Sequence, residues 1–201
     1  MAGIFARFKN YGWGFYMICT LLKENYLDKH QNNVAFYAGQ MGKIICQGMV
    51  DIVIEAALMH DVGKTEIDNK IIFRPGPLDE AEWEVMRLHP LLGASMIMRR
   101  VVKISSSKKC KPSTIALAVL HHHERWDGTG YPDGLAGDDI PLIARIIAVA
   151  DAFDAMTTDR PYRKALSKED AVKEIISCSG TQFDPNVAEV FTNNKFVLST
   201  V

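Results

Sequence analysis

The sequence lacks the patterns that identify several classes of protein. Its four cysteines, Cys19, Cys46, Cys110 and Cys178, are widely scattered and form no CxxC pair. A disulfide framework or a zinc knuckle is therefore not expected. Reduced thiols are usual in the cytoplasm, and we expect that location.

The apolar run near the start of the chain is too short to cross a membrane. The run at 11–22, YGWGFYMICTLL, is shorter than the roughly 20 residues that a transmembrane helix requires, and no signal-peptide cleavage pattern follows it. We expect no membrane span in this chain. We interpret residues 1–25 as a lead-in helix, buried or facing a partner, and residues 26–201 as the main domain.

The chain also lacks an excess of charge of either sign. Its formal net charge is −1 over 201 residues, which argues against binding of a long nucleic acid, because such binding needs many contacts that neutralise phosphates. A small anionic ligand held by a few cations remains compatible with this balance. The length fits one domain.

Signals for β-strands are weak throughout, and helical patterns dominate. Val34, Tyr37, Ala38 and Met41 recur at helical spacing. The apolar stretch 51–61 is interpreted as a helix that ends at a His-Asp pair. We therefore predict an all-α fold.

Helix boundaries can be assigned further along the chain. Asp79 and Glu82 have the spacing of a capping box, and the helix that they begin should carry His89 in a later turn. Pro90 should kink or interrupt that helix. Further helices are predicted at 91–102, at 113–123, at 141–157, from Ser167 and from Asp184-Pro185, and a glycine-rich loop at 124–140.

Seven residues of similar chemistry are spread along these elements. Imidazole nitrogen and carboxylate oxygen together suit a first-row transition metal, and seven ligands are about right for two ions that share a carboxylate. Asp151 lies inside an apolar helix, where a buried carboxylate is costly unless it is paired or bound to a metal. The seven are His30, His60, Asp61, His89, His122, His123 and Asp151.

Each of these residues also has an ordinary interpretation. Asp61 could cap a helix beside a surface His60, and His89 could be a hydrogen-bonded core histidine. His121, His122 and His123 could together form a surface patch, although the residues that follow them argue against this.

Three long motifs resemble one family. HDVGK at 60–64, HHERWDGTGYPDGLAGDDIP at 122–141 and ADAFDAMTTDRPYR at 150–163 resemble the HD-GYP domain, a bacterial branch of the HD phosphohydrolases that hydrolyses cyclic dinucleotides, chiefly cyclic di-GMP. The resemblance extends from about His30 to Phe191. It implies a compact HD-type bundle of about seven to nine helices with an extended Gly-rich GYP loop.

The resemblance also implies how metal ions are held. His30, His60, Asp61 and Asp151 would bind one divalent ion, and Asp61, His89, His122 and His123 would bind the second. Iron or manganese is the first choice, with zinc, nickel or magnesium as alternatives. Some family members carry a glutamate four residues before the first histidine that recruits a third ion. Tyr26 occupies that position here, so two ions are predicted and a third is in doubt.

The same resemblance implies catalytic roles and a reaction. Asp61 and Lys64 are the catalytic candidates: a hydroxide bridging the ions would attack the phosphodiester and give linear pGpG, which a second cut could convert to GMP. The substrate-binding candidates are Lys64, Tyr131, Asp154, Arg160 and Arg163. Asp154 could alternatively orient a metal ligand, Tyr131 could simply pack the loop, and the arginines could be surface charges.

Three further questions stay open on the sequence alone. The substrate could be cyclic GMP-AMP rather than cyclic di-GMP. The chain could instead be a non-catalytic receptor for a cyclic dinucleotide, although all the metal ligands of the pattern are present. The resemblance also allows an upstream sensor domain or a homodimer.

Overall fold

The computed structural model describes residues 25–104, 112–159 and 164–194, with side chains from residue 29 to 99 in the first range. Within these ranges the chain is helical, and its only β pairing consists of the isolated bridges Asp127–Ala136 and Ser179–Phe183. The prediction of an all-α fold is confirmed.

The helices are α3 (Asn25–Ile45), α4 (Val50–Met59), α5 (Asn69–Ile72), α6 (Glu80–Met86), α7 (His89–Ile104), α8 (Pro112–Leu120), α9 (Leu142–Thr157), α10 (Lys168–Ser177) and α11 (Pro185–Thr192), with short 3₁₀ turns η2 (Gln47–Met49), η3 (Val62–Glu66) and η4 (Gly137–Asp139).

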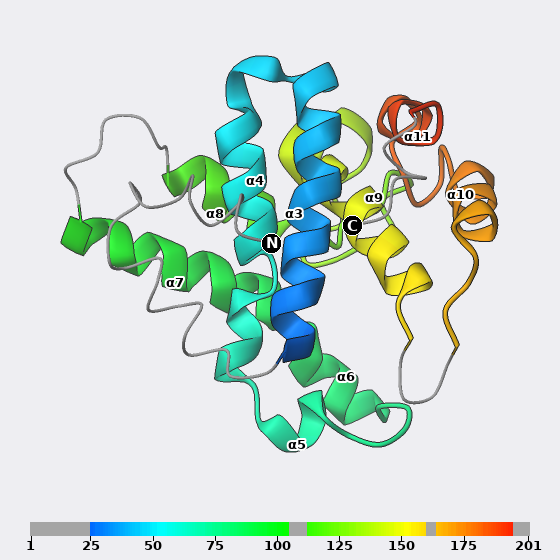
Figure 1. Ribbon diagram of the computed structural model, residues 1–201. Coiled ribbons are helices and arrows are strands. Elements are labelled where there is room, and N and C mark those ends of the chain that lie inside the picture. The colour runs from blue at the N-terminus through cyan, green and yellow to red at the C-terminus, as the bar shows by residue number, and fades with distance from the viewer. Residues whose placement is uncertain (1–24, 105–111, 160–163, 195–201) are drawn as a thin grey trace.

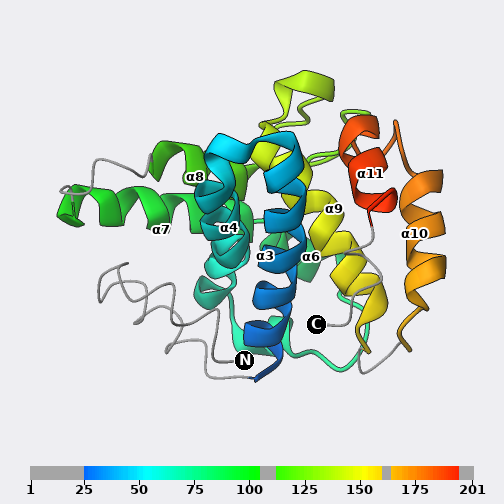
Figure 2. The same cartoon turned by 45° about the horizontal axis from the view of Figure 1, so that its top comes forward.

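Helix α3 is at the centre of the packing. It lies against α4 on one side and against α9 on the other, while α7 packs on α8 and on the turn η3 (Figure 1). Helices α10 and α11 cover the far side of α9, as the turned view shows (Figure 2). The site described below is formed where α3, α4, α7 and α9 come together.

Burial of the apolar stripe on α3 explains its position. Val34, Tyr37, Ala38 and Met41 are all buried, as expected for residues that recur at helical spacing. The Tyr37 ring meets the rings of Phe153 on α9, at 5.0 Å, and of Phe191 on α11, at 6.0 Å, both edge to face.

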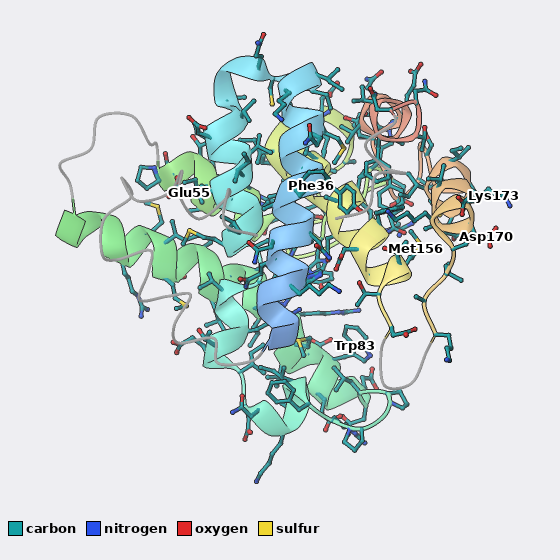
Figure 3. All side chains as sticks on the ribbon, in the orientation of Figure 1. Phe36, Glu55, Trp83, Met156, Asp170 and Lys173 are labelled. Carbon is teal, nitrogen blue, oxygen red and sulfur yellow. The ribbon has the colours of Figure 1, made fainter. Side chains whose placement is uncertain are left out.

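The outer surface contrasts with this core. Asp170 and Lys173 lie on the outer side of α10 (Figure 3), where their side chains form an ion pair of 2.8 Å. A pair this exposed contributes little to stability. No helix in the described ranges has the length and apolarity that crossing a membrane would take.

Several predicted helix starts are confirmed by their caps. Asp79 and Glu82 form the predicted capping box at the start of α6. The Ser167 side chain accepts a hydrogen bond from the Asp170 N–H, and Asp184 precedes Pro185 at the start of α11. These boundaries depend on local chemistry, which is why they could be read from the sequence.

The predicted position of His89 was wrong in one respect. Helix α6 ends at Met86, and His89 is the first residue of α7 rather than part of a later turn of α6. Pro90 accounts for the break, because proline suits the first turn of a helix and not its interior. The histidines after α8 likewise follow the helix, which ends at Leu120.

Some predictions concern residues outside the described ranges. These are the lead-in helix over most of 1–25, the residues Arg160 and Arg163, and the side chain of Tyr26.

Candidate metal centre

Five separate segments bring the seven candidate ligands together. The ligands come from α3 (His30), from the end of α4 (His60 and Asp61), from the start of α7 (His89), from the turn after α8 (His122 and His123) and from α9 (Asp151). They form two groups, each with ligand atoms within 4.8 Å of one another: the first group is His30, His60 and Asp151, and the second group is His89, His122 and His123.

Asp61 lies between the two groups. Its Oδ2 atom is 3.5 Å from His60 Nε2 and 3.8 Å from His30 Nε2. Its other oxygen, Oδ1, is 3.4 Å from His89 Nε2. One carboxylate therefore directs one oxygen toward each group.

Backbone carbonyls orient three of the histidines. In each, Nδ1 lies within hydrogen-bond distance of the carbonyl oxygen three residues earlier, which makes Nδ1 the donor and leaves Nε2 with its lone pair. The pairs are His60 with Ala57 (2.6 Å), His89 with Met86 (2.8 Å) and His122 with Val119 (2.7 Å). The three Nε2 atoms are thus available as ligands.

His60 Nε2 provides a test of whether a cation fits. This atom is buried and has no hydrogen-bond partner in the described part of the chain. An unpaired buried acceptor is costly, and a metal ion is a partner that an imidazole lone pair can bind. The residues of both groups therefore fit a bound transition metal, because they combine unprotonated imidazole nitrogens with carboxylate oxygens.

His30 is oriented by a side chain rather than by the backbone. Its Nδ1 atom lies 2.6 Å from Asp154 Oδ2, and its Nε2 atom lies 3.2 Å from Asp151 Oδ1. The Asn33 amide donates to the other Asp154 oxygen at 2.7 Å. Asp154 is itself buried, so it lies behind His30 and supports the ring, as the acid partner of a metal-binding histidine commonly does.

Electrostatics differ between the groups. Burial alone would lower the pKa of His30, but hydrogen bonds to Asp151 and Asp154 outweigh it and raise the pKa to about 10. Burial lowers the pKa of His123 to about 4 and the pKa of His122 well below its usual range. Without metal, His30 of the first group therefore attracts a proton, whereas His122 and His123 of the second group stay neutral.

Lys64 adds a positive charge beside the shared carboxylate. Its Nζ atom donates to Asp61 Oδ2 at 2.6 Å, and its side chain is 25% exposed. Although burial would raise the pKa of Asp61, the charge of Lys64 and the neighbouring histidines lower it well below its usual range. Asp61 is therefore a carboxylate, which is the form that binds metal.

Gly63 permits the close approach of the two elements that carry Asp61 and His89. A Cβ atom at Gly63 would lie 2.0 Å from the His89 carbonyl oxygen and 2.5 Å from the Gly93 nitrogen. Both neighbours are backbone atoms of α7, so neither can rotate away. The HDVGK motif thus needs glycine at this position for a steric reason.

The GYP loop reaches the second group through Tyr131. The Tyr131 ring stacks on the His123 ring, with centroids 4.9 Å apart and planes inclined by 26°. The guanidinium of Arg87, which follows the last residue of α6, lies 5.6 Å from the centroid of the Tyr131 ring. Arg87 was not among the predicted residues, since nothing in its local sequence distinguishes it from a surface arginine.

His121 does not join its two neighbours. Its Nε2 atom lies 2.9 Å from Asp133 Oδ2 and its Nδ1 atom lies 2.9 Å from the Leu117 carbonyl oxygen. Leaving it out of the ligand set agrees with this geometry. Asn33 and Glu124 were also missed as partners, because their contacts depend on residues remote in sequence.

Comparison with protein families matches a large part of the chain. The family described as "HD domain" matches residues 51–187. His30 lies before this range, whereas the other six candidate ligands lie inside it.

Two curated relatives extend the similarity. The chain is 36% identical over 176 residues to "Cyclic di-GMP phosphodiesterase response regulator RpfG" of Xanthomonas campestris, covering 88% of this chain and 44% of that protein. It is 38% identical over 165 residues to "3'3'-cGAMP-specific phosphodiesterase 3" of Vibrio cholerae, covering 81% of this chain and 34% of that protein. The chain thus spans less than half the length of these relatives.

A solved structure shows the same fold. An "HDG"Y"P protein" from Bdellovibrio bacteriovorus superimposes with a TM-score of 0.61 at 18% identity, over 83% of this chain and 51% of that one. At this identity the likeness concerns the helical architecture alone.

Proposed function

Since this chain belongs to the HD domain family, in its HD-GYP branch, we propose that it is a metal-dependent phosphodiesterase that hydrolyses cyclic di-GMP. The product is linear pGpG, with GMP as a further product. The observation that carries the proposal is the position of Asp61, with one oxygen toward each of two ligand groups. Relatives named as cyclic dinucleotide phosphodiesterases support it.

Two divalent ions would be held by the two groups with Asp61 shared between them. The mixture of imidazole and carboxylate suits iron or manganese, and also zinc or nickel, better than magnesium. When bound, such ions activate water and stabilise negative charge on a phosphodiester. The buried His60 Nε2 atom, which has no hydrogen-bond partner among the described residues, supports this assignment.

The protein's own side chains would position the substrate. Lys64, already beside Asp61, places a positive charge where a phosphate would approach. Tyr131 would hold His123 by stacking on its ring, and its side chain remains a predicted contact for the dinucleotide. Arg160 and Arg163 remain predicted phosphate or guanine contacts, because guanidinium groups bind both in two-point fashion.

Asp154 receives a different role from the one first assigned to it. Its carboxylate is buried behind His30 and accepts a hydrogen bond from Asn33, so neither oxygen is exposed for contact with a dinucleotide. We propose that it orients His30 and keeps its Nε2 atom directed at the first group, rather than binding substrate.

Cyclic GMP-AMP is the second candidate substrate. A relative named for that activity is 38% identical to this chain, which is as similar as relatives named for cyclic di-GMP. Both dinucleotides present the same phosphodiester ring, so the metal groups alone do not separate them.

Substitution of the shared carboxylate tests the proposal. Asp61→Ala in manganese- or iron-loaded protein should lower hydrolysis of both dinucleotides by at least about 10³-fold, because loss of the shared ligand removes several kcal/mol of charge stabilisation. Chromatography of the products measures the effect, and circular dichroism checks that the helices persist. Asp139→Ala, at an exposed position, is the matched control. Full activity of Asp61→Ala would contradict the mechanism, and tight binding without any product in the wild type would favour the receptor alternative.

A further inference from the structure

A second set of ligand-type side chains lies outside the metal centre. His121, Glu124 and Asp133, here called the loop cluster, offer one imidazole nitrogen and two carboxylate oxygens within 4.8 Å of one another. His121 and Glu124 are buried, and the Asp133 side chain is 56% exposed. The cluster joins the turn after α8 to the middle of the GYP loop.

The buried carboxylate in this cluster is incompletely satisfied. Glu124 Oε1 accepts a hydrogen bond from the Asp133 N–H at 2.7 Å. Its other oxygen, Oε2, is buried and has no hydrogen-bond partner among the described residues. A buried carboxyl oxygen without a partner is costly, so a cation that binds Oε2 would stabilise the cluster.

His121 is not the missing partner of this oxygen. Both of its ring nitrogens face acceptors, the Leu117 carbonyl at Nδ1 and Asp133 Oδ2 at Nε2, each at 2.9 Å. A neutral imidazole has only one N–H, so one acceptor would face a lone pair. Neither ring nitrogen is bonded to Glu124 Oε2.

We propose that the loop cluster is a third binding site, for a divalent transition-metal cation, separate from the metal centre. With Nδ1–H donated to Leu117, His121 Nε2 is a nitrogen ligand, and Glu124 and Asp133 supply oxygen. One imidazole and two carboxylates suit zinc or manganese. Solvent can complete the coordination on the exposed side of Asp133.

A cation at this site would fix the GYP loop. Asp133 follows Tyr131 by two positions, and Tyr131 stacks on His123 of the metal centre. His121 directly precedes the ligands His122 and His123. An ion that binds both ends of this segment would therefore hold Tyr131 in place against His123.

Counting bound ions tests the proposal independently of the enzyme's activity. The full chain, stripped of metal and dialysed against zinc or manganese, is analysed for ions per chain by mass spectrometry. The wild type should hold one ion more than Asp133→Asn and Glu124→Gln, or bind that ion at least about 10-fold more tightly. Asp139→Asn makes the same charge change at an exposed position outside the cluster and should match the wild type.

The failures of the two proposed sites are distinguishable. Equal counts and affinities in the wild type and Asp133→Asn would overturn the loop site. Failure of the metal centre would instead lower the counts of all variants together. Because Asp133 is exposed, its variant should fold even if Glu124→Gln does not. A second measurement tests the role in the loop: adding zinc should slow hydrogen exchange of residues 128–134 in the wild type but not in Asp133→Asn.

Discussion

The two ligand groups of the metal centre are built differently. The first group contains a carboxylate, Asp151, and its His30 is held by the buried Asp154 side chain. The second group consists of imidazoles alone, two of which are held by backbone carbonyls of their own segments. Asp61 lies between the two groups and directs one oxygen toward each.

This difference determines how each group can be disturbed. His30 and Asp154 are 124 positions apart in the chain, so the first group depends on helix packing and on one supporting side chain, in addition to the backbone carbonyl that orients His60. The second group depends on where the backbone of α7 and of the turn after α8 lies. A change in a supporting side chain should therefore weaken the first group selectively, whereas disturbing the second requires moving backbone or removing the Tyr131 stack.

Gly63→Ala should have the largest effect on stability, because it displaces the backbone of α7. Its Cβ atom would meet the His89 carbonyl oxygen and the Gly93 nitrogen, so the start of α7 must shift. We expect destabilisation of about 3 kcal/mol, measured by urea unfolding, together with weaker metal binding by the second group. Gly48→Ala is the matched control, since a Cβ atom there meets nothing within 4 Å. Equal stability of the two variants would show that the close approach is not required.

Asp154→Asn should act on the first group alone. The substitution keeps the shape of the side chain but removes the charge that faces His30 Nδ1 at 2.6 Å. We expect metal affinity of one ion to fall by about 10- to 100-fold, the usual effect of losing a supporting residue, while the other ion is unaffected. Calorimetric titration with manganese measures both affinities, with Asp139→Asn as the control. Equal weakening of both ions would contradict the division into two groups.

Tyr131 variants should give the smallest effect, on the second group. Removing the ring in Tyr131→Ala deletes the stack on His123, which is worth about 1 kcal/mol, or roughly fivefold in affinity for the metal. Tyr131→Phe keeps the ring and should leave metal binding unchanged. If Tyr131→Phe raises KM for the dinucleotide without changing metal affinity, the hydroxyl contacts substrate. If both variants match the wild type in both respects, the loop packing has no role at the site.

Short-range features of the fold could be predicted from local patterns. The helix at 51–61, the capping box at Asp79 and the start of α11 at Asp184 follow from side chains within one helical turn. The placement of His89 failed because the break at Met86 depends on how the following helix packs as well as on Pro90.

The sequence predicted which residues form the candidate site, but not how they contact one another. The seven ligand candidates were identified from residue type and motif, and the structure brings all seven together. Which residues meet could not be predicted: the choice of His30 as the histidine that Asp154 supports, the approach of Arg87 to Tyr131 and the contact of His121 with Asp133 all depend on distances between elements.

The sequence by itself therefore determined which helices form and which side chains can bind metal, because helix propensity, caps and ligand chemistry are properties of a few neighbouring residues. Only the tertiary structure decided that Asp61 faces both groups and that Glu124 is buried with no hydrogen-bond donor to its Oε2 atom among the described residues. Those facts depend on the packing of α3 against α4 and α9 and of α7 against α8 and η3, and packing distances are set by the whole core rather than by any one segment.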